Sequence, residues 1–396
     1  MGEWKETKWG NIVTLEYGKS LKGYQEKISG YRVYGTNGPI GWHEESLCDE
    51  AGVIIGRKGA YRGVHYSPEP FFVIDTAFYL KPKTKIDILW AYYSLLLCDI
   101  NSMDSGSAIP STSREDFYNL PVFLPPLPVQ KRIASILGTL DDKIELNRRM
   151  SATLEQMAQA LFRSWFVDFA PVRAQAEGRP TGLPPHIARL FPSEFEESPL
   201  GQIPKGWRVG TIDDIAAIND WTLSKKDDLD IIDYIEISEV IRGNVGNIER
   251  YYRGEEPGRA RRRLKHGDTI LSTVRPDRGA YFLVLNPPFS LIASTGFAVL
   301  STRDGSWAFL HAATTRDEFG QELGHLADGG AYPAVRPEII GSRILVLPNT
   351  SDLILVFEKI AKPLYERIDQ NREESRTLSA LRDTLLPKLL SGELEV

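Results

Sequence analysis

The chain has 396 residues, of which 42% are hydrophobic and 25% are charged, and its formal net charge at pH 7 is −6. This composition is typical of an ordinary globular protein, and the length favours two or three domains over one. No apolar run approaches the roughly 18 residues of a membrane-spanning helix, so we expect no membrane partner. The acidic balance argues weakly against nucleic acid, but a local basic patch matters more than the total.

Cysteine and histidine are scarce. Cys48 and Cys98 are the two cysteines, and the six histidines are scattered without the spacing of a zinc site. Two cysteines favour reduced thiols and a cytoplasmic location over a disulfide framework. We therefore predict no metal site. The chain also lacks a phosphate-binding loop of the type GxxxxGKS or GxxxxGKT, so it should not bind ATP in that way.

Residues 1–127 are predicted to form a first globular part. Short β-rich runs, such as residues 52–55 and 71–74, alternate with turn residues, and one helix is expected near residues 90–98. Because strands and helices do not alternate regularly, an α+β fold is favoured over a doubly wound one.

Residues 56–63 are the most suggestive stretch of the first globular part. Their sequence, GRKGAYRG, mixes three cationic residues and a tyrosine with three glycines. Glycine allows a backbone to approach phosphates closely, and arginine either binds phosphate or reads a guanine edge. An amide in the nearby sequence YGTNG adds hydrogen-bonding groups. The predicted DNA contacts here are Asn37, Arg57, Lys58, Tyr61 and Arg62.

Residues 128–169 are predicted to form one long spacer helix. Its seam residues recur at alternating steps of four and three, the heptad pattern of a helix that packs along another helix. Such a stripe cannot be buried alone, so a partner helix is expected. The seam positions are Ile133, Leu137, Leu140, Ile144, Asn147, Ser151, Leu154, Ala158, Leu161 and Trp165.

Residues 170–205 are predicted to be a linker. They are rich in proline, glycine and acidic residues, which favours a surface segment with little regular structure. Immediately after it, residues 207–215 (WRVGTIDDI) resemble residues 4–12 (WKETKWGNI), which marks the start of a second copy.

Residues 206–349 are predicted to form a second globular part that repeats the first. Residues 294–299 (STGFAV) resemble residues 75–80 (DTAFYL), and Pro333 matches Pro110. The similarity is weaker here than in the helices, so two similar scaffolds are expected to carry two different surfaces.

Basic residues gather at two places in the second globular part. One is the run within residues 253–265, and the other is residues 272–279 (STVRPDRG), the positional relative of residues 56–63. A basic run is often only a solvated face, but equivalent placement in both globular parts favours DNA contact. The predicted contacts are Arg261, Arg262, Arg263, Arg275 and Arg278.

Residues 286–289 (NPPF) offer an enzymatic alternative. The tetrapeptide looks like the catalytic signature of adenine-N6 methyltransferases, in which the asparagine holds the amino group and the phenylalanine stacks on the flipped base. No glycine-rich loop for S-adenosylmethionine accompanies it, and the repeat aligns it with residues 67–70 (SPEP). We therefore favour a turn between two strands and keep the methyltransferase as the alternative.

Residues 350–396 are predicted to form a second spacer helix. Its seam lies 224 positions after the first, as from Asn147 to Asn371. A buried asparagine is tolerated mainly where it fixes register. If the two helices pack antiparallel, their midpoints meet, which predicts a contact between Asn147 and Asn371.

The second seam departs from the first at three positions. Arg382 stands where the first seam has Ala158, and Pro363 and Pro387 lie near the two ends of the helix. Because proline removes a helical hydrogen bond and clashes with the preceding turn, we expect the second helix to be shorter or looser.

Four stretches carry a resemblance to a known family. They are residues 128–150 (PVQKRIASILGTLDDKIELNRRM), their echo at residues 353–389, residues 385–394 (LLPKLLSGEL) and residues 164–207. The whole chain resembles the specificity subunit of a type I restriction–modification system. The resemblance implies two target-recognition domains held apart by two helices in an antiparallel coiled coil, with pseudo-two-fold symmetry.

The resemblance also implies a function. The chain would bind double-stranded DNA, read an asymmetric two-part sequence with its two recognition domains, and have no catalysis of its own. Two methyltransferase subunits and ATP-dependent restriction subunits are the implied partners. S-adenosylmethionine, ATP and Mg²⁺ would belong to those partners, so no cofactor is expected on this chain. A coiled-coil adaptor without DNA contact is a third interpretation, against which the basic loops argue.

Overall fold

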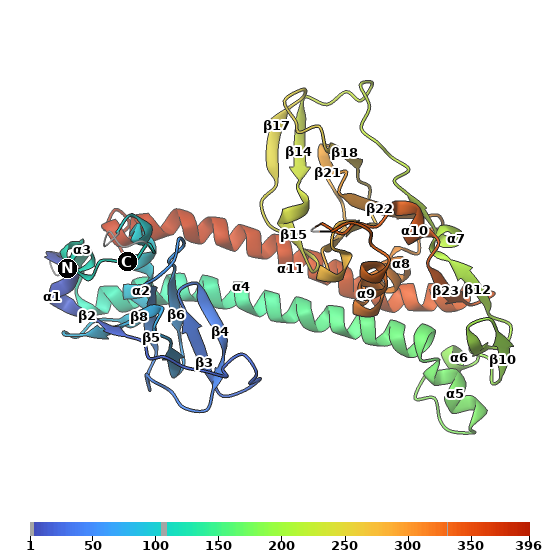
Figure 1. The fold of residues 1–396 in the computed structure, drawn as a ribbon, viewed down its shortest axis with the longest axis horizontal. Helices are drawn as coiled ribbons and strands as arrows, with labels where there is room; N and C mark the ends of the chain where they lie inside the picture. Colours follow the sequence, from blue (N-terminus) through green and yellow to red (C-terminus); the bar gives the residue numbers. More distant parts are fainter. Residues whose placement is uncertain (1–3, 104–108, 331) are drawn as a thin grey trace. The chain divides into compact units, whose positions relative to one another are not determined.

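The computed structural model describes residues 4–103, 109–330 and 332–396. The chain forms two compact units, one of Met1–Asn147 with Glu373–Val396 and one of Arg148–Arg372. We call them unit 1 and unit 2. Each contains one globular part together with a portion of both long helices, α4 (Leu127–Phe162) and α11 (Asp352–Ser391) (Figure 1). Among the described helices, none has the apolar length needed to cross a bilayer.

The globular part of unit 1 contains three small sheets. Their strand orders are β2-β8-β5-β6, β4-β3-β7 and β1-β9. The elements are β1 (Lys5–Lys8), α1 (Trp9–Ile12), β2 (Val13–Tyr17), β3 (Tyr31–Gly35), β4 (Gly38–His43), β5 (Gly52–Gly56), β6 (Val64–Ser67), β7 (Phe71–Val73), β8 (Ala77–Pro82), α2 (Ile88–Leu96), η1 (Ile100–Ser102), α3 (Arg114–Asn119) and β9 (Pro121–Leu124).

Local sequence explains several of these elements. The apolar run of β5 is buried along its whole length, as expected for the central position it takes beside β8 and β6. Helix α2 begins after Asp87, whose carboxylate accepts the Trp90 N–H at 2.9 Å, and α3 begins after Ser113, whose hydroxyl accepts the Asp116 N–H at 3.2 Å. Such caps satisfy donors that the first turn of a helix leaves unpaired.

The globular part of unit 2 repeats this plan with additions. Its strand orders are β13-β22-β19-β20, β17-β14-β21-β18, β12-β23 and β15-β16. The elements are β12 (Arg208–Thr211), α7 (Ile212–Ile215), β13 (Ala216–Ile218), β14 (Ile231–Ile235), η3 (Ile237–Glu239), β15 (Val240–Ile241), β16 (Asn244–Val245), β17 (Glu249–Tyr252), β18 (Ala260–Arg263), β19 (Asp268–Ser272), η4 (Pro276–Arg278), β20 (Tyr281–Val284), β21 (Leu291–Ser294), β22 (Phe297–Thr302), α8 (Trp307–Thr314), α9 (Asp317–His325), α10 (Pro337–Gly341) and β23 (Ile344–Leu347).

The topology confirms the internal repeat. β13-β22-β19-β20 follows the same order of equivalent strands as β2-β8-β5-β6. In unit 1, β3 pairs antiparallel with β4 and parallel with β7, and in unit 2, β14 pairs antiparallel with β17 and parallel with β21. Unit 2 adds β18 to this second sheet and places α9 after α8. The repeat is therefore a shared scaffold with local insertions.

The two long helices pack antiparallel within each unit, as the seam predicts. In unit 1, Asp141 of α4 pairs with Arg382 of α11 at 2.7 Å, and Lys143, further along α4, pairs with Glu374, which lies earlier in α11. Leu137 and Leu389 belong to the same core, against which α2 also packs. In unit 2, Phe162 and Phe357 lie in contact in a second core that receives α8. Each globular part is thus built onto a helix pair.

The two seam asparagines make matching hydrogen bonds. Asn147 is 1% exposed and donates to Ser375 Oγ at 3.4 Å and to Glu374 Oε2 at 2.8 Å. Asn371 is also 1% exposed and donates to Ser151 Oγ at 3.2 Å. Ser375 and Ser151 are repeat counterparts, so each asparagine bonds the same serine position on the other helix. A direct contact between Asn147 and Asn371 would join the two units and stays a prediction.

Two expectations about the chain are wrong. The linker is not irregular: it forms α5 (Ala170–Ala176), α6 (Pro185–Ala188) and a hairpin of β10 (Phe195–Ser198) and β11 (Gly201–Pro204). The reason is burial, because its Phe191 is buried and packs edge-on against Trp165 with ring centroids 5.3 Å apart.

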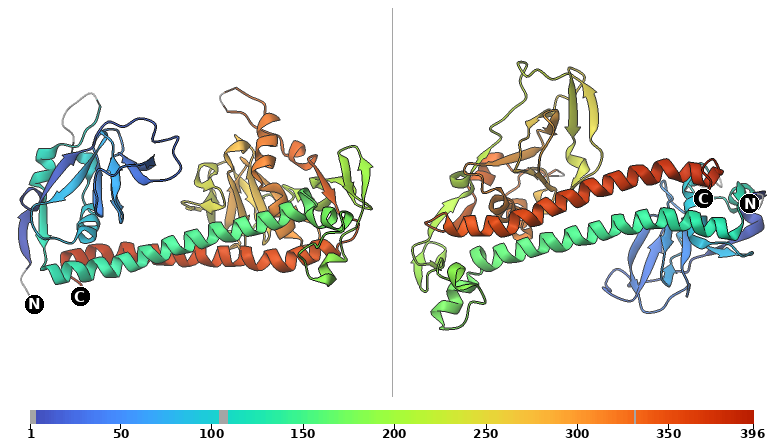
Figure 2. Two further views of the ribbon diagram at one scale, coloured as in Figure 1. Left: turned by 90° about the horizontal axis from the view of Figure 1, so that it is seen from below. Right: turned by 180° about the vertical axis from the view of Figure 1, so that it is seen from behind.

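The second helix is also not shortened by its prolines. Helix α11 runs through both Pro363 and Pro387, and both views in Figure 2 show it as one uninterrupted helix. Phe357 and Tyr365, on either side of Pro363, are 0% and 3% exposed. Burial of large side chains offsets the cost of a proline inside a helix, which is about 3 kcal/mol.

Candidate nucleic-acid interface

The first basic loop, residues 56–63, connects β5 to β6 and is held by main-chain hydrogen bonds. The Gly59 N–H donates to the Pro110 carbonyl at 3.0 Å, and the Thr112 N–H donates to the Arg57 carbonyl at 2.8 Å. Lys58 and Ser111 form a β-bridge between these bonds. The loop is therefore joined like a short strand to residues 109–112, which we call the first proline segment.

The second basic loop, residues 272–279, connects β19 to β20 and is held in the same way. The Arg275 N–H donates to the Pro333 carbonyl at 2.8 Å, and the Val335 N–H donates to the Thr273 carbonyl at 2.9 Å. We call residues 332–335 the second proline segment. The predicted equivalence of the two basic loops, and of Pro110 with Pro333, is thus confirmed by the hydrogen bonds themselves.

Exposed hydrogen-bonding groups surround the first basic loop. The Tyr61 side chain is 78% exposed, and Lys58 is exposed. The Gly63 N–H donates to the Thr36 carbonyl at 3.1 Å, which holds the β3–β4 turn beside the loop. Asn37 is exposed in that turn. The structure therefore brings Asn37, Lys58 and Tyr61 to one part of the surface of unit 1.

Arg57 is half-buried and already engaged. Its guanidinium donates to the Asp75 carbonyl at 2.8 Å and lies 4.8 Å from the centre of the Tyr17 ring. Such a cation–π contact fixes the plane of a guanidinium. Asp75 thus holds the first basic loop through its main-chain carbonyl.

Arg62 does not lie where a DNA contact needs it, which corrects the prediction. Its side chain is 3% exposed, and its guanidinium donates to the carbonyls of Gly59, Ile100, Asn101 and Met103. A buried guanidinium with carbonyl partners closes a turn of the backbone and presents no donor to a ligand outside. Arg62 therefore supports the loop from beneath.

Arg263 likewise points inward and corrects a second prediction. It is 2% exposed, forms an ion pair with Asp227, and its guanidinium lies 4.0 Å from the Trp221 ring centre and 3.9 Å from that of Phe289. A buried arginine between two rings has both faces covered. Its neighbour Arg262 is partly buried, and this burial lowers the pKa of its guanidinium. Arg261, on the same strand, is exposed.

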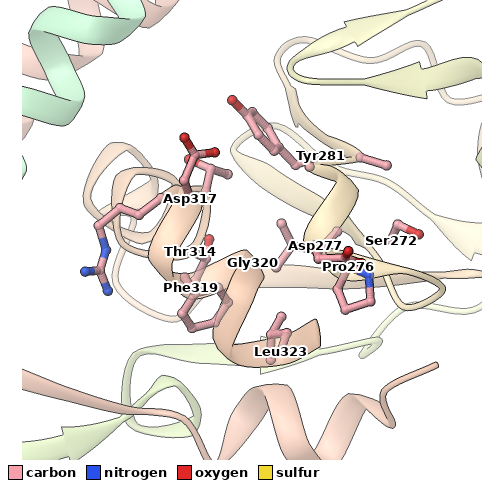
Figure 3. A pocket seen from close by; sticks show the side chains of 14 residues that line it. Ser272, Pro276, Asp277, Tyr281, Thr314, Asp317, Phe319, Gly320 and Leu323 are labelled. Atoms are coloured by element: carbon pink, nitrogen blue, oxygen red, sulfur yellow. The ribbon is translucent and has the colours of Figure 1, made fainter. Parts of the chain in front are cut away.

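The second basic loop rests on α9, a helix without a counterpart among the described residues of unit 1. Gly324 of α9 lies so close to Asp277 that an added Cβ would come within 2.9 Å of the Asp277 Cβ. Figure 3 shows the small pocket between them, with Pro276 and Asp277 of the loop on one side and Phe319 and Leu323 of α9 on the other. Arg278, the counterpart of Arg62, is exposed here. Helix α9 thus supplies the support that Arg62 supplies in unit 1.

Residues 286–289 form the connection between β20 and β21, as predicted. Asn286 has a left-handed φ of 44°, its N–H donates to His266 Nδ1 at 3.2 Å, and its Oδ1 lies 3.1 Å from the same nitrogen. Phe289 stacks on Arg263. The two residues that a methyltransferase would use for its base are therefore engaged within the fold. Within the described ranges, no group of three or more His, Cys, Asp or Glu side chains is placed to hold a metal ion.

Two exposed residues of the interface were not predicted. Tyr332 is 73% exposed and Ile109 is 62% exposed, and each directly precedes the proline that accepts the N–H of its basic loop. The Tyr332 ring lies 4.8 Å from the Arg275 guanidinium. The match of Pro333 with Pro110 was the sequence signal for these positions, because it aligns Tyr332 with Ile109.

Several known proteins are similar to this chain in sequence. A family model described as the type I restriction modification DNA specificity domain matches residues 1–156. The HindI type I restriction enzyme specificity subunit of Haemophilus influenzae is 25% identical over 383 residues, covering 82% of this chain and 81% of that protein. The MjaVIII specificity subunit of Methanocaldococcus jannaschii is 22% identical over 369 residues, covering 89% and 81%. The chain is therefore similar to type I specificity subunits over most of its length.

A solved structure has the same fold as this chain. The S subunit of the type I restriction–modification system from M. genitalium aligns over 98% of this chain and 96% of its own, with a TM-score of 0.61 and 15% sequence identity. At this identity the likeness concerns the fold alone. The two basic loops therefore lie on a fold that is also found in that solved structure.

Proposed function

We propose that this specificity subunit recognises a two-part DNA sequence, one part with each globular part, and carries no catalytic chemistry of its own. The observation that supports the proposal is the repeated frame: a basic loop bonded to a proline segment occurs in both globular parts. The frames are alike and their exposed side chains differ. Two such surfaces on one chain suit an asymmetric site with two unlike halves.

The predicted contact residues suit both kinds of DNA contact. Lys58, Arg261 and Arg278 are exposed cations that suit phosphates, whereas Arg275 and the amide of Asn37 suit base edges. Phosphate contacts fix the position of the protein, and base contacts select the sequence. Because the net charge of the chain is −6, attraction to DNA must come from such local groups.

The proposal includes the partners. The family relatives are named as subunits of type I restriction enzymes. We propose that two methyltransferase subunits and the restriction subunits assemble on this chain in the cytoplasm. S-adenosylmethionine, ATP and Mg²⁺ then act on those subunits, and the long helices set the gap between the two half-sites. Half-sites one turn of DNA apart are about 34–36 Å from each other.

A methylation map tests the function. The chain is produced with its modification subunit in a host free of adenine methylation, and methylated adenines are located by long-read sequencing. A two-part motif is expected, and it should survive Asn286→Ala. Loss of the motif in a folded, assembled Asn286→Ala complex would instead move the chemistry onto this chain.

Charge reversals test the interface. Lys58→Glu and Arg278→Glu change exposed residues of the two basic loops, and Arg189→Glu changes an exposed cation of the linker region as a matched control. Each loop variant should weaken DNA binding by the assembled complex and reduce the salt dependence by about one counterion. If all three variants bind DNA with equal affinity, the two basic loops do not contact DNA and the adaptor interpretation is favoured.

A further inference from the structure

The first basic loop presents fewer cations to a ligand than its sequence suggests. Arg62 is buried against main-chain carbonyls. Arg57 is half-buried, donates to the Asp75 carbonyl and lies against the Tyr17 ring. Lys58 is exposed, and its ammonium group suits a phosphate. The loop therefore lacks a fully exposed arginine with which to read a guanine edge.

Tyr61 is the large side chain that this loop does expose. It is 78% exposed, and its ring and hydroxyl make no hydrogen bond or ring contact with another of the described residues. Its neighbour Arg62 turns inward, so the two successive side chains point to opposite sides of the loop. An aromatic ring thus stands on the surface beside a single exposed ammonium group.

The main chain on both sides of the Tyr61 side chain is held in place. The Arg62 N–H donates to Asn101 Oδ1 at 2.8 Å. With its amide oriented to match its neighbours, the nitrogen of Asn37 donates to the Tyr61 carbonyl at 2.5 Å. The ring therefore projects from an ordered backbone, and less conformational freedom has to be lost when a ligand binds.

We propose that Tyr61 selects a thymine in the first half-site, which is the part of the DNA sequence read by unit 1. Its ring packs against the C5 methyl group of that thymine in the major groove. This methyl is the apolar group by which thymine differs from the other three bases there, and a ring supplies the apolar surface that the contact buries. The inference rests on the proposed DNA-reading function and names a residue and a base for one half-site.

The second basic loop has a different group at the equivalent place. Arg278 is the counterpart of Arg62, so Asp277 is the counterpart of Tyr61. Asp277 lies close to Gly324 of α9 and carries a carboxylate, which offers no apolar surface to a methyl group. The thymine requirement created by Tyr61 therefore belongs to the first half-site alone.

Replacement of thymine by uracil tests the contact, because uracil lacks the C5 methyl group and keeps every hydrogen-bonding group of thymine. Binding of the complex with its modification subunits is measured on duplexes in which each thymine of the two-part motif is replaced in turn. A position in one half-site should lose about fourfold in affinity, as expected for one methyl group no longer buried. In Tyr61→Ser, thymine and uracil should bind equally at that position, and the other positions should be unchanged.

Two further variants separate the ring from its hydroxyl and from the loss of any exposed tyrosine. Tyr61→Phe keeps the ring, so it should keep the preference for thymine over uracil. Tyr252→Ser removes a tyrosine of β17 that is 71% exposed, and it should leave that preference unchanged. Because the loop is held by main-chain hydrogen bonds, hydrogen exchange of residues 56–63 should be the same in Tyr61→Ser and in the wild type.

Three results would overturn the inference. If no uracil replacement weakens binding by the wild type, no methyl group is read. If the preference for thymine persists in Tyr61→Ser, another side chain reads it. If Tyr61→Phe loses as much affinity for all sequences as Tyr61→Ser does, the hydroxyl contacts a phosphate. In each case the unchanged complex still methylates a two-part motif, whereas failure of the proposed function leaves no such motif.

Discussion

The two basic loops share a main-chain frame but rest on different supports. In unit 1 the support is a side chain, because Arg62 turns inward and donates to the carbonyls of Ile100, Asn101 and Met103. In unit 2 the support is α9, and the counterpart Arg278 stays exposed. The same residue type at the same repeat position therefore has opposite roles. What decides the role is the segment packed beneath, which lies far away in the sequence.

The globular parts also differ in how they join the helices. In unit 1, Tyr93 of α2 donates to Asp141 of α4 at 2.6 Å, and Asp141 pairs with Arg382 of α11. In unit 2, Tyr281 of β20 donates to Glu155 of α4 at 2.8 Å, and burial raises the pKa of that carboxyl. Arg382 thus has a partner that explains its place in the seam, where an arginine would otherwise be unfavourable.

The largest expected effect comes from β18, which only unit 2 adds to its second sheet. Arg263→Ala should destabilise unit 2 by about 2–5 kcal/mol, because it breaks the ion pair with Asp227 and empties the buried space between Trp221 and Phe289. Hydrogen exchange of unit 2 peptides in the full chain measures the effect. Arg261→Ala, on the exposed side of the same strand, should change it by less than about 0.5 kcal/mol. Equal losses of stability from the two substitutions would indicate that Arg263 is exposed and not buried.

A pH response should distinguish the units next. Asp268 begins β19 where β5 begins with Gly52, and burial raises its pKa to about 6, although Lys265 and Ser301 donate to it. Because the pKa is raised, this group contributes stability fully below about pH 4, and the contribution is lost as pH rises through 6. Relative to Asp268→Asn, the wild type should lose up to about 3 kcal/mol between pH 4 and 7. Hydrogen exchange of β19 peptides measures the stability difference between the wild type and Asp268→Asn. If that difference stays constant between pH 4 and 7, the pKa of Asp268 is not raised.

The paired arginines test the difference in support directly. Arg62→Ala should destabilise the first basic loop by about 2–3 kcal/mol, because several carbonyls lose a charged donor. Arg278→Ala should leave the stability of the second basic loop within about 0.5 kcal/mol. Exchange of peptides covering residues 56–63 and 272–279 reports both. If Arg278→Ala lowers the stability of its loop more than Arg62→Ala does, Arg278 and not Arg62 is the supporting residue.

The smallest expected effect concerns the helix seam, where the units are alike. Asn147→Ala should cost unit 1 about 1 kcal/mol and Asn371→Ala should cost unit 2 the same, because each removes a hydrogen bond to a repeat-equivalent serine. Double substitutions with Ser375→Ala and Ser151→Ala, measured by denaturation of the full chain, isolate each pair. A coupling energy between asparagine and serine in one unit, with none in the other, would show that the two pairs are not equivalent.

Periodic and repeated features could be predicted from the sequence, and burial by distant segments could not. The heptad steps gave the two long helices, and the repeat gave the equivalence of the two basic loops. Arg62 and Arg263 were misjudged because residues 100–103 in one case, and Trp221 and Phe289 in the other, cover them only after folding. The linker was misjudged because its proline content outweighed the apolar Phe191. Tyr332 could not be predicted because its position beside Arg275 depends on the main-chain hydrogen bond from Arg275 to Pro333, which forms only on folding.

The frame of each basic loop is built from main-chain donors and acceptors. Gly59 with Pro110 and Arg275 with Pro333 bond through backbone atoms alone. Substituting an exposed side chain such as Lys58 or Tyr61 therefore leaves every frame bond in place. A combinatorial library at such positions should yield mostly folded proteins, and its members would differ in what they bind. The exposed positions of the two basic loops can therefore vary in sequence while the main-chain frame keeps its structure.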